Sequence, residues 1–161
     1  MEKYRFGKYN PKFARYFELE KKRLLKIVPN AKIEHIGSTA IQGLGGKGIV
    51  DILIGVDKKR MVSLKELLTK NGYACKESVG SGRRLFFEKS YGLIFKRKVH
   101  LQLTWLDSSV WRDALKFKDK LIISSTLLKE YADINKEATN LGLEGKEYRD
   151  YKRKFIEGVL R

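Results

Sequence analysis

The sequence predicts a mixed α/β fold (α+β), with one sheet flanked by helices and further helices towards the C-terminus. Three observations favour this class. An amphipathic helix opens the chain, a glycine-rich segment leads into a strand that is apolar on both faces, and the last third shows helical spacing. Because 42% of the 161 residues are hydrophobic, we expect a single domain over residues 1–161, whose helical part begins at about residue 108.

The first half of the chain alternates helices and strands. We expect a helix over residues 11–28, strands over 31–36 and 49–56, and a helix over 57–70. The first helix carries Phe13, Phe17 and Leu24 at near-helical spacing and stops before Pro29. The second strand has no polar face, which is typical of a strand in the middle of a sheet.

The second half begins with strands and ends with helices. We expect strands over residues 73–78, 83–89 and 95–105, and helices over 108–121, 125–141 and 145–161. Two hairpin signals separate these strands: the closely spaced Gly80 and Gly82, and the Tyr91-Gly92 dipeptide. These elements complete a mixed sheet with helices before, within and after it.

The charge of the chain indicates an anionic partner. Lys and Arg number 35 against 19 Asp and Glu, which gives a net charge of +16 and a field that attracts phosphates on nucleotides, nucleic acid or lipid. Aromatic residues are not interleaved with the basic runs, and this disfavours a nucleic-acid surface built on base stacking. The lone Cys75 has no partner for an internal disulfide or a thiolate metal site.

The sequence also predicts a cytoplasmic protein without a membrane anchor. No stretch approaches the roughly 18 to 20 apolar residues of a membrane span. The N-terminal residues lack the apolar core of a signal peptide. The sequence does not indicate an oligomeric state.

A carboxylate within an apolar run is the first candidate for chemistry. Asp51 lies in the strand predicted over residues 49–56, where an ionised group is costly unless a cation, a metal or several donors compensate it. Upstream, Gly37, Ser38 and Thr39 follow a strand end, and such a turn offers N–H groups and two hydroxyls to a phosphate. Alternatively, Ser38 caps a helix and Asp51 bonds to the backbone; the spacing leaves both interpretations open.

The segment HIGSTAIQGLGGKGIVDI, residues 35–52, resembles the signature of the GrpB-like family. Later segments continue the resemblance over nearly the whole chain: HLQLTW, WRDALKFKDKL, YADINKEA and YRDYKRKFI. That family is similar to the DNA polymerase beta nucleotidyltransferase superfamily. The resemblance implies a nucleotidyltransferase-like sheet, a phosphate-binding turn at Gly37, Ser38 and Thr39, and a catalytic Asp51 that holds Mg²⁺ or Mn²⁺.

The departures from that superfamily weaken the metal site. Its second carboxylate lies two residues after the first, and Leu53 occupies this position here, without an oxygen ligand. His100 and Gln102 share one face of a neighbouring predicted strand and are the nearest replacements. A cluster of Asp51, His100 and His35 would suit a transition metal better than magnesium, but Gln102, where many relatives have a second histidine, weakens it. For each histidine, a hydrogen-bonded structural role remains open.

Further basic residues are candidates for substrate binding. Lys47 ends the glycine-rich segment, and Arg83, with its neighbour Arg84, follows the hairpin glycines, so each side chain could bind an anion or lie in solvent. Lys136 and Lys152 fall in the C-terminal segments that resemble the family, where they would close a cleft over the sheet or form a charged helix surface.

Three functions follow from these features. The first is a metal-dependent nucleotidyltransferase that transfers a nucleoside monophosphate to a small molecule or a protein. The second is a binding module for a nucleotide or a phosphorylated small molecule, which keeps the turn and lacks the second carboxylate. The third is a nucleic-acid-associated protein that uses the +16 charge.

Overall fold

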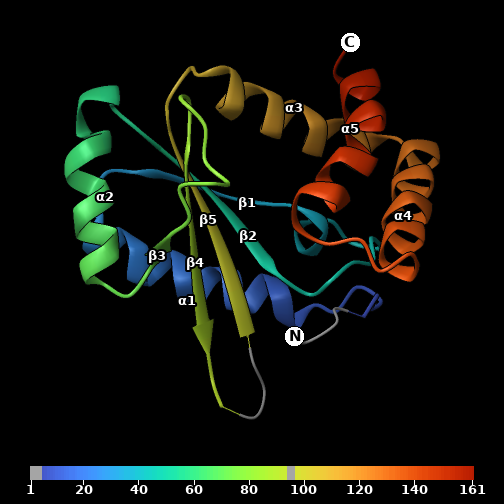
Figure 1. The fold of residues 1–161 in the computed structure, drawn as a ribbon, viewed down its shortest axis with the longest axis horizontal. Helices are drawn as coiled ribbons and strands as arrows, with labels where there is room; N and C mark the ends of the chain where they lie inside the picture. Colours follow the sequence, from blue (N-terminus) through green and yellow to red (C-terminus); the bar gives the residue numbers. More distant parts are fainter. Residues whose placement is uncertain (1–4, 94–96) are drawn as a thin grey trace.

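The computed structural model describes residues 5–93 and 97–161 and shows a five-stranded mixed sheet with five α-helices (Figure 1). The helices are α1 (Lys12–Ile27), α2 (Met61–Lys70), α3 (Ser109–Ile123), α4 (Ser125–Asn140) and α5 (Gly145–Leu160). The strands are β1 (Lys32–Ile36), β2 (Val50–Val56), β3 (Ala74–Cys75), β4 (Leu85–Tyr91) and β5 (Arg97–Trp105). Two short 3₁₀ turns, η1 (Ser38–Ala40) and η2 (Lys58–Arg60), follow β1 and β2. The predicted α/β class is confirmed.

The order of the strands is β1-β2-β5-β4-β3, so β2 and β5 are interior strands. These two run parallel, and the other neighbours in the sheet are antiparallel. Because side chains alternate along a strand, each strand sends every second residue to either face. The sheet therefore has two distinct faces, one that packs in the main core and one on the opposite side.

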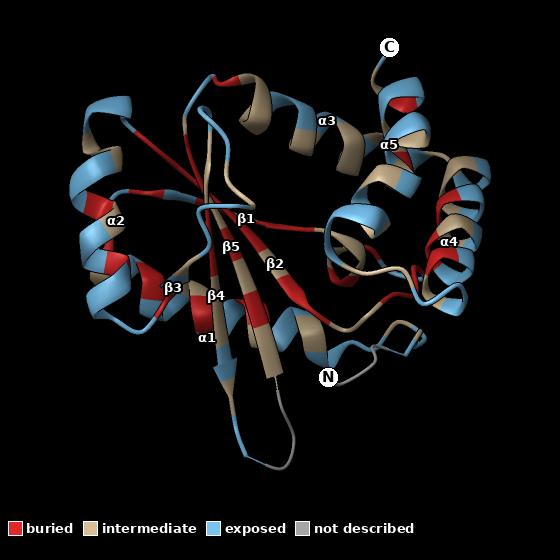
Figure 2. Cartoon of the chain, in the orientation of Figure 1, coloured by how far each residue is buried: buried red, intermediate tan, exposed pale blue. Residues whose placement is uncertain are grey.

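Helices α1 and α2 cover the core face of the sheet (Figures 1 and 2). Leu24 of α1 and Leu68 of α2 are fully buried against strand residues such as Ile52, Leu101 and Phe87. Burying a side chain of this size stabilises the fold by about 1.5–3 kcal/mol. The apolar stripe predicted for the first helix is thus part of the main core.

The opposite face of the sheet carries the C-terminal helices α3, α4 and α5, which form a second apolar cluster around Leu121 and Tyr131. Helix α3 lies close to the sheet at Gly55, where an added Cβ would be 2.6 Å from atoms of Trp111 and Leu106. Beyond this contact, the remaining part of the face is open to the cleft described below.

A buried carboxylate links α1 to the sheet. Glu20 is fully buried, and its Oε1 accepts hydrogen bonds from the hydroxyls of Tyr73 and Tyr91, the latter at 2.7 Å. Its Oε2 lies 3.2 Å from the Arg23 guanidinium, whose side chain is half exposed. Burial, followed by the hydrogen bond to Glu20, raises the pKa of Tyr73 far above its usual value, so this phenol remains a donor.

The strands in the middle of the chain differ from their predicted bounds. The strand predicted over residues 73–78 is reduced to Ala74–Cys75, because Lys76 starts a turn in which its carbonyl accepts from Val79 and Gly80 N–H groups. The strand predicted over 83–89 starts and ends two residues later. Residues 95 and 96 of the predicted strand 95–105 lie outside the described residues, and the strand is described from Arg97.

None of the helices in residues 5–93 and 97–161 is long and apolar enough to cross a membrane.

Candidate functional site

A cleft of about 410 Å³ lies between the open face of the sheet and helices α4 and α5. Its floor comes from β2, β4 and β5, one end comes from the turn after β1, and its other wall comes from α4 and α5. The polar and aromatic residues that line it are Ser38, Lys47, Asp51, Arg84, Phe86, Glu88, His100, Gln102, Tyr131, Asn135, Glu144, Tyr148, Arg149 and Lys152.

The turn after β1 and the carboxylate of β2 meet at one end of this cleft. An added Cβ at Gly37 would be 2.4 Å from the Asp51 Oδ2 atom, and the φ of Gly37 is +74°, so only glycine fits here. Ser38 and Asp51 both line the cleft, as we expected from the sequence. The Asp51 side chain is 24% exposed, so it faces the cleft while the rest of its strand is buried.

Asp51 begins a row of three ionisable side chains across the sheet. The register places Asp51 opposite His100, and His100 opposite Glu88 on the next strand. The His100 Nδ1 atom lies 3.3 Å from the Asp51 Oδ1 atom, and its Nε2 atom lies 3.5 Å from the Glu88 Oε1 atom. His100 therefore lies between two carboxylates, and its buried Nε2 atom makes no hydrogen bond within the described residues.

This row does not form a ligand set for a divalent metal. Among residues 5–93 and 97–161, no three or more His, Cys, Asp and Glu side chains are placed to hold a metal ion. The two nitrogens of His100 face different carboxylates, so they do not converge on a point that Asp51 and Glu88 share. Leu53, at the position of the second carboxylate, is fully buried. The predicted Mg²⁺, Mn²⁺ or transition-metal site finds no support in this arrangement.

Gln102 faces the cleft, but it has a different partner from the one we expected. Its Oε1 atom accepts a 2.8 Å hydrogen bond from the Arg84 guanidinium. A metal ion at this oxygen would lie beside a fixed positive charge, which opposes its binding. Leu101 and Leu103 point into the core, as strand alternation predicts.

His35 lies on the core face of the sheet, away from the cleft, and so does not join the proposed metal cluster. It stacks on Phe17, with 4.6 Å between ring centroids, and its Nε2 atom is 2.9 Å from the Thr39 hydroxyl. That hydroxyl donates to the Ile49 carbonyl, so Nε2 is the donor in the contact with Thr39. Both His35 and Thr39 are buried, and the Thr39 hydroxyl ties the turn to Ile49, the residue before β2, instead of lining the cleft.

The burial of His35 predicts loss of stability in acid. Burial, and then the charge of Lys118, lowers the pKa of His35 to about 4 from 6.5. Below pH 6.5 the unfolded chain takes up a proton that the folded chain does not, so the free energy of unfolding falls between pH 6.5 and pH 4 by about 3 kcal/mol. Urea unfolding at several pH values measures this loss. A His35→Gln variant should lack this part of the pH dependence, and an equal dependence in both proteins would contradict the assignment.

Two lysines and a tyrosine form a cationic wall next to Ser38. The ammonium groups of Lys47 and Lys152 lie 3.6 Å and 4.2 Å from the centroid of the Tyr148 ring. Lys152 also donates to the Tyr131 hydroxyl at 3.3 Å. Burial lowers the pKa of both lysines, and the charge of Lys152 lowers that of Lys47 further. A bound anion would offset both effects.

Besides Thr39, two of the predicted substrate-binding residues do not line the cleft. Arg83 donates to the Ser109 hydroxyl at 2.8 Å on the surface, while its neighbour Arg84 turns into the cleft. Lys136 is exposed on α4 and does not line the cleft. The sequence did not indicate Glu88, Asn135 or Arg149. For Arg149, the spacing of three residues from Lys152 places both on one side of a helix and is a usable signal.

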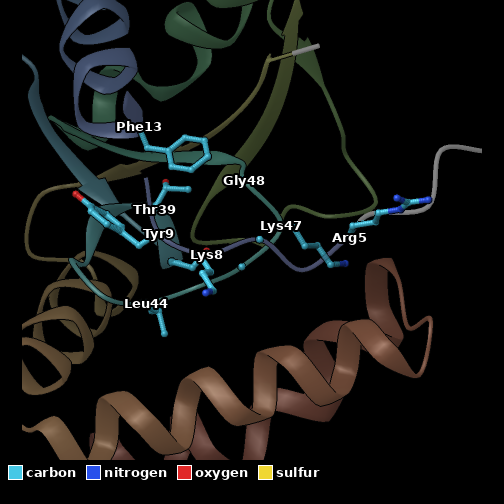
Figure 3. A pocket seen from close by; sticks show the side chains of 11 residues that line it. Arg5, Lys8, Tyr9, Phe13, Thr39, Leu44, Lys47 and Gly48 are labelled. Atoms are coloured by element: carbon cyan, nitrogen blue, oxygen red, sulfur yellow. The ribbon is translucent and has the colours of Figure 1, made fainter. Parts of the chain in front are cut away.

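A second, smaller cavity of about 80 Å³ lies between the N-terminal segment and the glycine-rich segment (Figure 3). Figure 3 shows Tyr9 and Phe13 beside Thr39, with Lys47 extending from the segment. Gly7 and Gly46 exchange backbone hydrogen bonds of 2.8 Å and 2.9 Å, and an added Cβ at Gly46 would be 2.2 Å from the Ser38 hydroxyl oxygen. The N-terminal segment therefore holds the glycine-rich segment against Ser38.

The family of the chain is shown by sequence comparison. A family model described as GrpB protein matches residues 4–161. The chain belongs to the GrpB family. Within this family, the UPF0157 protein VC_A0354 of Vibrio cholerae is 32% identical over 147 residues, which cover 91% of this chain and 73% of the relative. The UPF0157 protein YqkA of Bacillus subtilis is 35% identical over 133 residues, or 80% of this chain, and the chain spans only 38% of YqkA.

The fold agrees with a solved GrpB structure. The crystal structure of GrpB from Enterococcus faecalis has a TM-score of 0.79 and 25% identity, and the match covers 97% of each chain. The Cid1 poly(U) polymerase bound to MgATP has a TM-score of 0.47 and 14% identity over 79% of this chain and 44% of that chain. At this distance the likeness to Cid1 is no guide to a reaction, and the names of the GrpB relatives state none.

Proposed function

We propose that this GrpB-family protein binds the phosphate groups of a nucleotide or a phosphorylated small molecule in the cleft. The observation that carries this proposal is the pair of half-buried ammonium groups, Lys47 and Lys152, held against the Tyr148 ring beside Ser38. Two like charges in a partly enclosed site repel each other, and an anion between them lowers that energy. The +16 charge of the chain would also bring anionic ligands to the cleft.

Replacing Lys152 tests the proposal. Lys152→Met keeps the length of the side chain and removes its charge, so the affinity for pyrophosphate should fall about tenfold to a hundredfold, the range for losing a hydrogen bond to a charged group. Isothermal titration at constant ionic strength measures the affinity. Lys136→Met is the matched control, because Lys136 is exposed outside the cleft. Equal losses in both variants would mean that only the overall charge of the protein matters.

Nucleotidyl transfer is a second candidate, and the meeting of Gly37, Ser38 and Asp51 at one end of the cleft favours it. In such a transfer an acceptor oxygen attacks the α-phosphorus of a nucleoside triphosphate, and pyrophosphate leaves. Release of pyrophosphate, measured with and without Mg²⁺ or Mn²⁺, distinguishes the two functions. If a nucleoside triphosphate binds but no acceptor tested leads to release of pyrophosphate, the result would contradict nucleotidyl transfer and favour ligand binding alone.

A further inference from the structure

The far end of the cleft contains a second set of positive charges. Arg84 enters the cleft just before β4 begins, and its guanidinium donates to Gln102 Oε1 at 2.8 Å and to the Val79 carbonyl at 3.4 Å. These contacts come from a strand side chain and from a turn, so they fix the guanidinium from two directions. Gln102 is thus a positioning residue for Arg84.

The strand register separates this charge from the lysine wall. Strand β1 ends at Ile36, which is opposite Asp51, so Ser38 lies past Asp51 in the direction away from Leu53. Gln102 is opposite Leu53, two residues and about 7 Å further along the sheet in the other direction. The row formed by Asp51, His100 and Glu88 therefore lies between Ser38 at one end and Arg84 at the other.

Helix α5 contributes a positive charge to each end of the cleft. Lys152 belongs to the lysine wall, while Arg149 lies near enough to Arg84 that its charge, after burial, lowers the pKa of Arg84. A guanidinium offers paired N–H donors that fit the two oxygens of a carboxylate or a phosphate. Two such groups that line one cleft, Arg84 half-buried and Arg149 exposed, form a site for an oxyanion, because an anion between them offsets their repulsion.

We propose that Arg84 and Arg149, with Gln102 as support, form a second oxyanion subsite in the cleft. The proposal rests on the proposed function, in which Lys47, Lys152 and Ser38 bind the first phosphate. The ligand is then a molecule with two anionic groups, one on each side of the row formed by Asp51, His100 and Glu88. A ligand with a single anionic group would fill only one of the two ends.

Counting bound oxyanions tests this inference. Crystals soaked in selenate, a tetrahedral dianion with an anomalous signal, should show two ions in the cleft, one beside Lys47 and one beside Arg84. Arg84→Ala should lose only the second ion, and Lys47→Ala should lose only the first. Arg83→Ala is the matched control: it removes the same charge one residue earlier, where the guanidinium contacts Ser109 outside the cleft. It should keep both ions.

Titration with pyrophosphate and with succinate then distinguishes a phosphate from a carboxylate at this subsite. Arg84→Ala should weaken the preferred probe about tenfold or more, Gln102→Met should weaken it less, and Arg83→Ala should change it less than twofold. One selenate ion that only Lys47→Ala removes would overturn the second subsite and keep the proposed function. Two ions that neither variant affects, or none in the wild-type cleft, would overturn both.

Discussion

Glu20→Ala is expected to lower the free energy of unfolding by about 3–5 kcal/mol, the range found when one partner of a buried charged network is removed. Glu20 is fully buried and accepts hydrogen bonds from two tyrosine hydroxyls while it pairs with Arg23. Its loss leaves the hydroxyl of the fully buried Tyr73 without this acceptor, and it also leaves a cavity. Such a loss is a large part of the 5–15 kcal/mol of a typical domain.

Equilibrium unfolding in urea measures the effect as a lower midpoint with an unchanged slope. Glu18→Ala is the control, because Glu18 is exposed on the same helix and its replacement should change stability by less than about 0.5 kcal/mol. A Glu20→Ala variant that unfolds at the midpoint of Glu18→Ala would show that the two tyrosines and Arg23 find other partners.

Gly37→Ala is expected to reduce both stability and ligand binding. The backbone of Gly37, with φ +74° and ψ −173°, lies in a region that is essentially restricted to glycine, and strain there costs about 1–3 kcal/mol. The new Cβ would also be 2.4 Å from the Asp51 Oδ2 atom, so the carboxylate must move and carry His100 with it. We expect the affinity for pyrophosphate to fall at least tenfold, measured by isothermal titration.

Gly142→Ala separates this contact from the effect of a positive φ alone. Gly142 has φ +71°, but an added Cβ there meets no atom within 4 Å in the described structure. This variant should lose about 1–2 kcal/mol of stability through backbone strain and keep the affinity for pyrophosphate. If Gly37→Ala binds pyrophosphate as Gly142→Ala does, the position of Asp51 has no influence on the phosphate site.

Most of the fold could be predicted from the sequence, because its signals are local. The two-sided apolarity of the strand at residues 50–56 follows from its interior place in the sheet, and the helix at residues 12–27 follows from its stripe and from Pro29. The strand after Gly72 is shorter than its sequence predicts. Its β-forming residues compete with a turn at Lys76, and the tertiary structure determines which of the two forms. The expectation of a nucleotidyltransferase-like sheet came from the resemblance to the GrpB family, and membership of the GrpB family is confirmed.

The site could be predicted only in part. Asp51 and Ser38 line the same end of the cleft because they lie on consecutive elements of the chain, so their spacing in the sequence predicts that they are close. Whether Arg83 or its neighbour enters the cleft depends on the turn at Ser81, which pairs with Arg84. Glu88 takes its role from the pairing of β4 with β5, and no local pattern shows which residues will be opposite each other.

The paired hydrogen bonds between Gly7 and Gly46 have a consequence for access to the cleft. Each glycine needs the other as both donor and acceptor, so their amide hydrogens are expected to exchange with solvent together, in one local opening event. Opening would also release Ser38, which packs on Gly46. We therefore expect the Ser38 end of the cleft to become less ordered each time the short segment around Gly7 detaches.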